Sequence, residues 1–290
     1  MRTIAFQTDR HRTWRKFKNA TMMGATVAAT LATLVPLFLV LSYLVKQGLF
    51  GINWAFFTRL PRPVGEMGGG MGNAVLGTIE LVGLASILAV PLGIGTGIYL
   101  SEPGHNGTAT NVVRFAADVL MGVPSIVVGI FAYGVVVRPM GGFSALAGAF
   151  ALATMMTPLV ARTAEEALRL VPAELRESAL ALGIPRWRTS VSVVARTAAR
   201  GIATGVLLAL ARIAGETAPL LFTAFGNQYW STSLKQPIAA LTVQVYTYAI
   251  SPFEDWHRQA WAGALVLTAM VLLVEALVRL LSGRRLRVPR

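Results

Sequence analysis

Long apolar stretches separated by polar segments dominate this sequence. Six of them have the length needed to cross a membrane, which takes about 20 mostly apolar residues in a helix. They cover residues 20–45, 74–100, 112–137, 143–160, 198–225 and 260–281. The pattern predicts an all-α integral membrane protein with six transmembrane helices. The first stretch follows a basic segment, as in a signal peptide, but it is far longer than the apolar region of such a peptide, so we interpret it as a retained helix.

Positive residues are distributed unevenly between the predicted loops, and this asymmetry predicts the orientation. Cytoplasmic loops carry an excess of Lys and Arg. With the N-terminus inside, 19 of the 26 Lys and Arg residues fall on the cytoplasmic side and six fall outside. The remaining one, Arg212, lies within a span. We therefore predict that both termini are cytoplasmic.

The predicted spans divide the chain into successive segments. The order is a basic cytoplasmic tail (1–19), a first transmembrane helix (20–45), an external loop (46–73), a core of five spans (74–282) that includes a cytoplasmic loop (161–197), and a second basic tail (283–290). Glycine pairs one turn apart, at Gly93 with Gly97 and Gly201 with Gly205, predict close approach of helices.

Composition supports a membrane protein and narrows its chemistry. The chain of 290 residues is 54% hydrophobic and 13% charged, against roughly 25% charged residues in an ordinary soluble domain. A net charge of +13 and a pI near 11.1 could indicate nucleic-acid binding, but a mean hydropathy of +0.60 favours the membrane. The chain has no cysteine and only three separated histidines. We therefore expect no nucleic-acid partner, no resident cofactor and no metal site.

The longest inside loop has the pattern of two short helices that meet at a glycine corner. Pro172 suits the first turn of a helix, Leu175 and Leu182 recur at helical spacing, and Gly183 can end the helix. A second helix is predicted from near Pro185. The loop could lie on anionic lipid headgroups, or it could be a docking surface for a partner protein.

This loop resembles the "EAA" loop of ABC importer permeases in Glu177-Ser178-Ala179, Gly183 and Val193. Ser178 replaces the usual first alanine, and Ala195-Arg196 stands where Leu-Pro is usual. The resemblance implies a type I importer permease fold whose loop docks on a separate ATPase. It assigns the docking contact to six residues: Glu177, Ala179, Gly183, Pro185, Arg186 and Trp187. No Gly-Lys dipeptide occurs in the chain, so a Walker A phosphate loop is excluded, and ATP hydrolysis is expected on a partner.

Two charged residues lie deep in the fifth predicted span. Arg212 and Glu216 are spaced i and i+4, which places them on one face of a continuous helix. Ionisable residues inside membrane spans usually face a bundle interior or an aqueous path. A buried guanidinium stays charged and offers several fixed donors, so it suits a tetrahedral oxyanion. The alternative is an ion pair that only stabilises its own helix.

Other charges in or near the spans have simpler interpretations. Arg114 with Asp118, and Glu275 with Arg279, are spaced i and i+4 near predicted cytoplasmic helix ends, which favours structural pairs. Glu80 could line an external vestibule or reach the membrane surface.

The segment 211–220 resembles the signature of phosphate-specific ABC importer permeases, through its Arg-x-x-Gly-Glu-Thr-Ala-Pro run. Residues in the loops resemble the A-type rather than the C-type subunit: Phe56-Phe57-Thr58, Pro61-Arg62-Pro63, Gly68–Gly70, Asn73, Gly77-Thr78, Gly122-Val123-Pro124-Ser125, Gln236-Pro237-Ile238 and Ser251-Pro252-Phe253. The resemblance implies a permease in a bacterial cytoplasmic membrane that moves inorganic phosphate past Arg212 and Glu216. It also implies a heterodimer with a C-type permease, two ATP-binding subunits and an external phosphate-binding protein.

Charge alone leaves other transport functions open. The same arginine could serve an importer of sulfate or molybdate, and Glu216 could serve as the proton relay of a secondary transporter. A membrane-embedded enzyme is disfavoured, because the chain contains no HExxH, GxSxG or membrane carboxylate dyad.

Overall fold

The computed structural model describes residues 9–63, 66, 68–102 and 107–284, and these residues are mostly helical. Within those ranges there is no named β-strand, only an isolated bridge between Phe225 and Ile238. Four helices are long and apolar enough to cross a membrane, and the number rises to six if each of two bent helix pairs is one span. The predicted all-α membrane fold is confirmed. Contacts divide the chain into two compact units, residues 1–47 and 48–290.

Helix α1 (Asp9–Leu49) makes up most of the first unit and contains the predicted first span. At 1.5 Å per residue its 41 residues extend about 60 Å, well beyond the roughly 30 Å of a bilayer core. Large apolar side chains along it are exposed, including Phe38 at 67%. Such a surface suits lipid or another membrane helix.

Helix α7 (Ala145–Arg169) is the centre of the second unit, between α3 (Gly72–Ser101) and α11 (Ala199–Ala214). Glycines allow both neighbours to approach α7 closely. A Cβ added at Gly97 would lie 2.7 Å from Cβ of Ala164, and one added at Gly205 would lie 2.3 Å from Oγ1 of Thr163. The predicted role of these glycine pairs is confirmed.

Side-chain caps fix the beginnings of two helices. Asn53 Oδ1 accepts a hydrogen bond from the backbone N–H of Phe56 at 2.8 Å, at the start of α2 (Trp54–Thr58). Ser144 Oγ does the same for the N–H of Ala147 at 3.1 Å, at the start of α7. The fourth predicted span ends at residue 160, but α7 continues about two and a half turns further, to Arg169.

The third predicted span, 112–137, is broken rather than continuous. Helices α4 (Thr108–Gly122) and α5 (Ser125–Ala132) meet at 105°, and a π-helix, η1 (Tyr133–Val137), and α6 (Arg138–Met140) follow. The cause is Pro124, which lacks an N–H and disfavours helical geometry in the residue before it. Val123 is accordingly extended, with ψ 131°.

The fifth predicted span, 198–225, is also interrupted. A bend of 73° at its first residue, Ala198, separates α11 from the helix that precedes it. Helix α11 then ends at Ala214, and a short α12 (Ala218–Leu221) begins after three non-helical residues. The segment before α11 comprises α9 (Arg186–Arg188), a π-helix, η2 (Thr189–Val194), and α10 (Ala195–Thr197).

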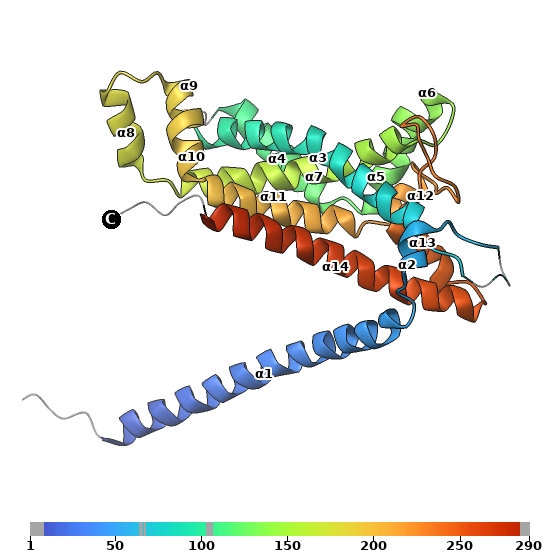
Figure 1. Ribbon diagram of the computed structural model, residues 1–290. Coiled ribbons are helices and arrows are strands. Elements are labelled where there is room, and N and C mark those ends of the chain that lie inside the picture. The colour runs from blue at the N-terminus through green and yellow to red at the C-terminus, as the bar shows by residue number, and fades with distance from the viewer. Residues whose placement is uncertain (1–8, 64–65, 67, 103–106, 285–290) are drawn as a thin grey trace, which may run out of the picture. The chain divides into compact units, whose positions relative to one another are not determined.

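The remaining helices are α8 (Ala173–Ala181), α13 (Leu241–Ala249) and α14 (Glu254–Arg284). Figure 1 shows, within the second unit, that α8, α9 and α10 lie at one end of the helical bundle and that α6, α12 and α13 lie at the other. Helices α3 and α11 run between the two ends.

Candidate functional site

Arg212 and Glu216 form a loose ion pair where α11 ends. Nε of Arg212 lies 3.9 Å from Oε1 of Glu216. The Arg212 side chain is 46% exposed and that of Glu216 is 18% exposed. The two residues are therefore together, as predicted, but two expectations are wrong. The arginine is not buried within this chain, and Glu216 is not on a helical face with it, because α11 ends at Ala214.

Backbone hydrogen bonds end α11, and the following α12 packs against α5. The N–H groups of Gly215 and Glu216 donate to the carbonyl oxygens of Arg212 and Ile213, each at 3.2 Å. Downstream, Pro219 is buried in the first turn of α12, where a Cβ added at Gly129 of α5 would lie 2.8 Å from its Cα. The break that sets the position of Glu216 is therefore a packed feature.

The chemistry of this arrangement suits a weakly held oxyanion. At 3.9 Å the pair is longer than a charge-assisted hydrogen bond, so Glu216 does not saturate the guanidinium. The remaining donors of Arg212 can bond to tetrahedral oxygens, while the nearby carboxylate limits how tightly an anion is held. Among the described residues, no group of three or more His, Asp or Glu side chains could hold a metal ion.

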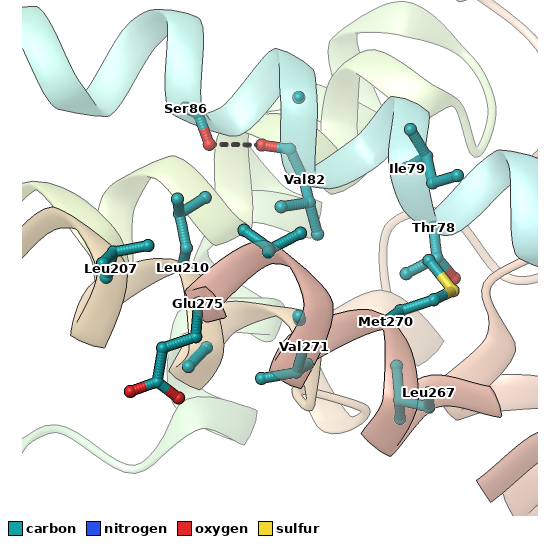
Figure 2. A pocket seen from close by; sticks show the side chains of 14 residues that line it. Thr78, Ile79, Val82, Ser86, Leu207, Leu210, Leu267, Met270, Val271 and Glu275 are labelled. Carbon is teal, nitrogen blue, oxygen red and sulfur yellow. Dashed lines mark hydrogen bonds between the residues drawn. The ribbon is translucent and has the colours of Figure 1, made fainter. Parts of the chain in front are cut away.

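A separate apolar pocket lies between α3, α11 and α14, and Figure 2 shows its lining. Its volume is about 230 Å³. The residues that α11 contributes to it are Leu207, Leu210, Ala211 and Ala214. At 100° per residue, Arg212 projects from nearly the opposite side of α11. The pocket has no basic lining residue, and the Glu275 carboxylate points away from the other lining side chains, so it does not suit an oxyanion.

The predicted glycine corner of the inner loop is present. Gly183 has φ +80°, a left-handed conformation that residues with a Cβ rarely adopt. Its N–H donates to the Leu180 carbonyl at 2.9 Å, and the N–H of Ile184 donates to the Ala179 carbonyl at 3.2 Å, which is the Schellman pattern of a helix end. The two arms, α8 and α9–η2–α10, form what we call the coupling hairpin (173–197).

The six predicted docking residues fall on this hairpin but differ in exposure. Glu177 and Ala179 lie on α8, where Ala179 is buried. Pro185 precedes α9, which contains Arg186 and Trp187. Trp187 is 70% exposed, so it is available to a partner, whereas Ala179 stabilises the hairpin from inside.

A buried carboxylate on α7 pairs with three arginines, a cluster that was not predicted from the sequence. Glu165 is 1% exposed, and its oxygens lie 2.7 Å from Nε of Arg114, Nη1 of Arg162 and Nη2 of Arg169. Arg162 also lies 3.0 Å from Asp118. The predicted Arg114–Asp118 pair is wrong, because Arg114 pairs with α7 instead. The i+3 and i+4 spacing of basic residues around Glu165 was the available signal.

The pair of Arg176 and Glu102 was not predicted, although Arg176 directly precedes the motif residue Glu177. Nη1 of Arg176 lies 3.3 Å from Oε1 of Glu102. Of the other charges noted in the spans, Glu80 is half-buried on α3. The side chain of Arg279 lies outside the described residues, so the pairing of Arg279 with Glu275 stays a prediction.

Residues 89–287, more than half of the chain, match the family described as "Binding-protein-dependent transport system inner membrane component". The chain belongs to this family. As an inner membrane component of such a transport system, it is a permease and not an enzyme. The family also implies an ATPase and a binding protein as partners.

Proteins from distant organisms resemble this family member over nearly their whole length. The "Phosphate transport system permease protein PstA" of Yersinia pestis is 45% identical over 94% of this chain and 92% of its own length. That of Xylella fastidiosa (strain 9a5c) is 48% identical over 93% and 94%. The "Probable phosphate transport system permease protein PstA" of Methanocaldococcus jannaschii is 37% identical over 93% and 95%.

Solved structures support the permease fold at lower identity. A bacterial ABC transporter involved in import of the acidic polysaccharide alginate has a chain that is 16% identical, with a TM-score of 0.68 over 95% of this chain and 100% of that one. The inward-facing MetNI methionine ABC transporter is 18% identical, with a TM-score of 0.58 over 74% and 94%.

Proposed function

We propose that this chain is the A-type permease subunit of an ATP-driven inorganic phosphate importer in the bacterial cytoplasmic membrane, with both termini inside. The half-exposed Arg212 beside Glu216 carries the proposal, because it presents a permanent fork of donors to a tetrahedral anion. The phosphate permeases from Yersinia and Xylella, at 45% and 48% identity, support this choice of anion.

The proposed partners follow from surfaces that one chain leaves open. Arg212 is at the surface of the single chain, so a C-type permease would complete the path around it. The coupling hairpin, with exposed Trp187, would dock on one of two ATP-binding subunits. An external phosphate-binding protein would deliver the anion, and lipid would surround the apolar helices.

Transport by the complete complex in proteoliposomes tests the proposal. We expect Arg212→Gln to assemble with its partners and to hydrolyse ATP, while ATP-dependent phosphate uptake is lost. Normal uptake by this variant would exclude Arg212 from the path.

Competition and energy source separate the alternatives. Excess sulfate or molybdate should leave phosphate uptake unchanged, whereas strong competition would indicate an importer for another oxyanion. Uptake that survives ATP depletion and fails without a proton gradient would indicate a secondary transporter instead.

A further inference from the structure

A single carboxylate ties both arms of the coupling hairpin to the end of α3. Glu102 directly follows α3, and its Oε1 accepts hydrogen bonds from Nη1 of Arg176 at 3.3 Å and from Oγ of Ser190. Arg176 lies on α8 and Ser190 lies on η2. Arg176 also donates to the carbonyl oxygen of Leu168 near the end of α7, at 3.1 Å.

This joint is shielded from water. The side chains of Arg176 and Glu102 are 12% and 18% exposed, and Ser190 is buried. A pair of this kind holds its geometry better than an exposed ion pair, which solvent screens and side-chain entropy weakens. The joint therefore gives the hairpin a well-ordered connection to the end of α3.

The opposite end of α3 holds the segment that contains Glu216. Buried Thr78 accepts a hydrogen bond at Oγ1 from the N–H of Leu241, at 2.8 Å. The next residue, Thr242, donates from Oγ1 to the carbonyl oxygen of Glu216 at 3.0 Å. Two side-chain hydrogen bonds, joined by one peptide unit, thus connect α3 with the backbone of Glu216.

The two charged residues of the ion pair therefore have different connections: Arg212 is part of α11, and Glu216 is linked to α3 through Leu241 and Thr242. Arg212 is part of α11, which begins directly after the hairpin, and it moves with that helix. Glu216 lies two residues beyond the end of α11, where its N–H donates to Ile213 of α11 and its carbonyl oxygen accepts from Thr242, which links it to the α3 side as well. A shift of α3 along α11 changes the separation of the two charges.

We propose that Arg176, Glu102 and Thr78 are positioning residues for transport, which make α3 the connecting rod between the coupling hairpin and Glu216. The proposal rests on the proposed coupling of this hairpin to an ATPase. Movement imposed on α8 would shift α3 through Glu102 and so alter the Arg212–Glu216 pair. Coupling between distant sites can be carried by such a contiguous set of contacts when the set has two discrete arrangements.

A distance measurement in the assembled complex tests this without depending on the transported anion. The chain has no cysteine, so spin labels can be placed at Leu76→Cys on α3 and Leu208→Cys on α11, both exposed positions. With cysteine-free partners, trapping by ATP and vanadate should shift the distance between the labels. In Arg176→Gln the shift should fall at least threefold, and the phosphate taken up per ATP hydrolysed should fall about tenfold.

Controls separate the joint from general damage. Arg196→Gln, at an exposed position on α10, removes the same charge from the hairpin and should leave both readouts unchanged. The double variant Arg176→Glu with Glu102→Arg should recover at least half of the distance shift. Should Arg176→Gln release the ATPase, Glu102→Gln, which lies outside the hairpin, takes its place.

The outcomes are distinct. An undiminished shift in Arg176→Gln and Glu102→Gln, with the ATPase bound, would overturn the connecting-rod proposal. A normal wild-type shift without any phosphate uptake by the wild-type complex would instead overturn the proposed function and leave the joint supported. Thr78→Val should keep ATP hydrolysis and lower the phosphate taken up per ATP, because it breaks the contact between α3 and Leu241 at the end of α3 that is far from the hairpin.

Discussion

Nε of Arg114 lies 2.7 Å from Oε1 of Glu165, so that α4 is joined to α7 by a pair whose carboxylate is almost completely buried. The same carboxylate also neutralises part of the charge of Arg162 and Arg169. Removal of one member of a buried charge group leaves the others uncompensated, which costs more than the pair contributes by its presence.

We therefore expect Glu165→Gln to destabilise the subunit by about 3 kcal/mol, the low end of the range for a broken buried pair, because the three arginine side chains are 19%, 25% and 52% exposed. The neighbouring Glu166 is exposed, and Glu166→Gln provides the matched control, with an expected change near zero. Thermal unfolding of both purified variants in detergent measures the difference. Equal melting temperatures would mean that the arginines find other partners when Glu165 is neutral.

Gly97 and Gly95 offer a second matched pair on α3. A Cβ at Gly97 would meet Ala164 of α7 at 2.7 Å, whereas a Cβ at Gly95 would meet nothing within 4 Å. We expect Gly97→Ala to cost about 1–3 kcal/mol through overpacking. Gly95→Ala should be neutral or slightly stabilising, since alanine is the better helix former. The same unfolding measurement checks both, and a cost for Gly95→Ala alone would contradict the packing assignment.

The left-handed conformation of Gly183 predicts a defect in docking. Gly183→Ala must adopt φ near +80°, which costs about 1–2 kcal/mol for a residue with a Cβ. Co-purification of an untagged ATPase should fall about five- to thirty-fold if the hairpin corner is needed for docking. Gly142→Ala, at an open position without positive φ, serves as the control. Full recovery of ATPase with Gly183→Ala would show that the corner can rearrange at no cost.

Substitution of lysine for Arg212 tests geometry separately from charge. Lysine keeps the positive charge but lacks the planar fork, so Arg212→Lys should lower phosphate uptake at least tenfold without loss of assembly. Arg138→Lys, at an exposed position on α6, controls for the substitution itself. Uptake near the wild-type rate would mean that a point charge suffices, and the oxyanion would then be attracted rather than coordinated.

Periodicity predicted most of the helices, because spans of about 20 apolar residues have few alternatives in sequence. It failed at Val123–Pro124 and after Ala214, where hydropathy stays high while the backbone turns. A hydropathy pattern measures the surroundings of side chains and contains little information about backbone direction. Proline and glycine marked both positions, and they outweighed the apolar pattern.

The candidate site could be predicted in identity but only partly in geometry. Arg212 and Glu216 were found because charges are rare in spans, and the glycine corner because Gly183 has few structural substitutes. Glu102 and Arg176 were missed because they lie 74 residues apart in the chain. For Glu165, the local spacing of Arg162 and Arg169 was available, but Arg114 lies 51 residues away. Local spacing suggested Asp118 for Arg114, and long-range packing placed Glu165 closer.

The burial of α7 also bears on how the protein is made. Two-thirds of its most apolar window is covered by other helices, against 28% for α3 and 22% for α14. Among these three helices, α7 has the lowest mean hydropathy, so its small and ionisable residues make it the least favourable helix to insert into lipid by itself during synthesis. We expect its insertion to depend on α3 already being in the bilayer, so that biogenesis proceeds by the capture of a weakly inserting helix by its neighbour.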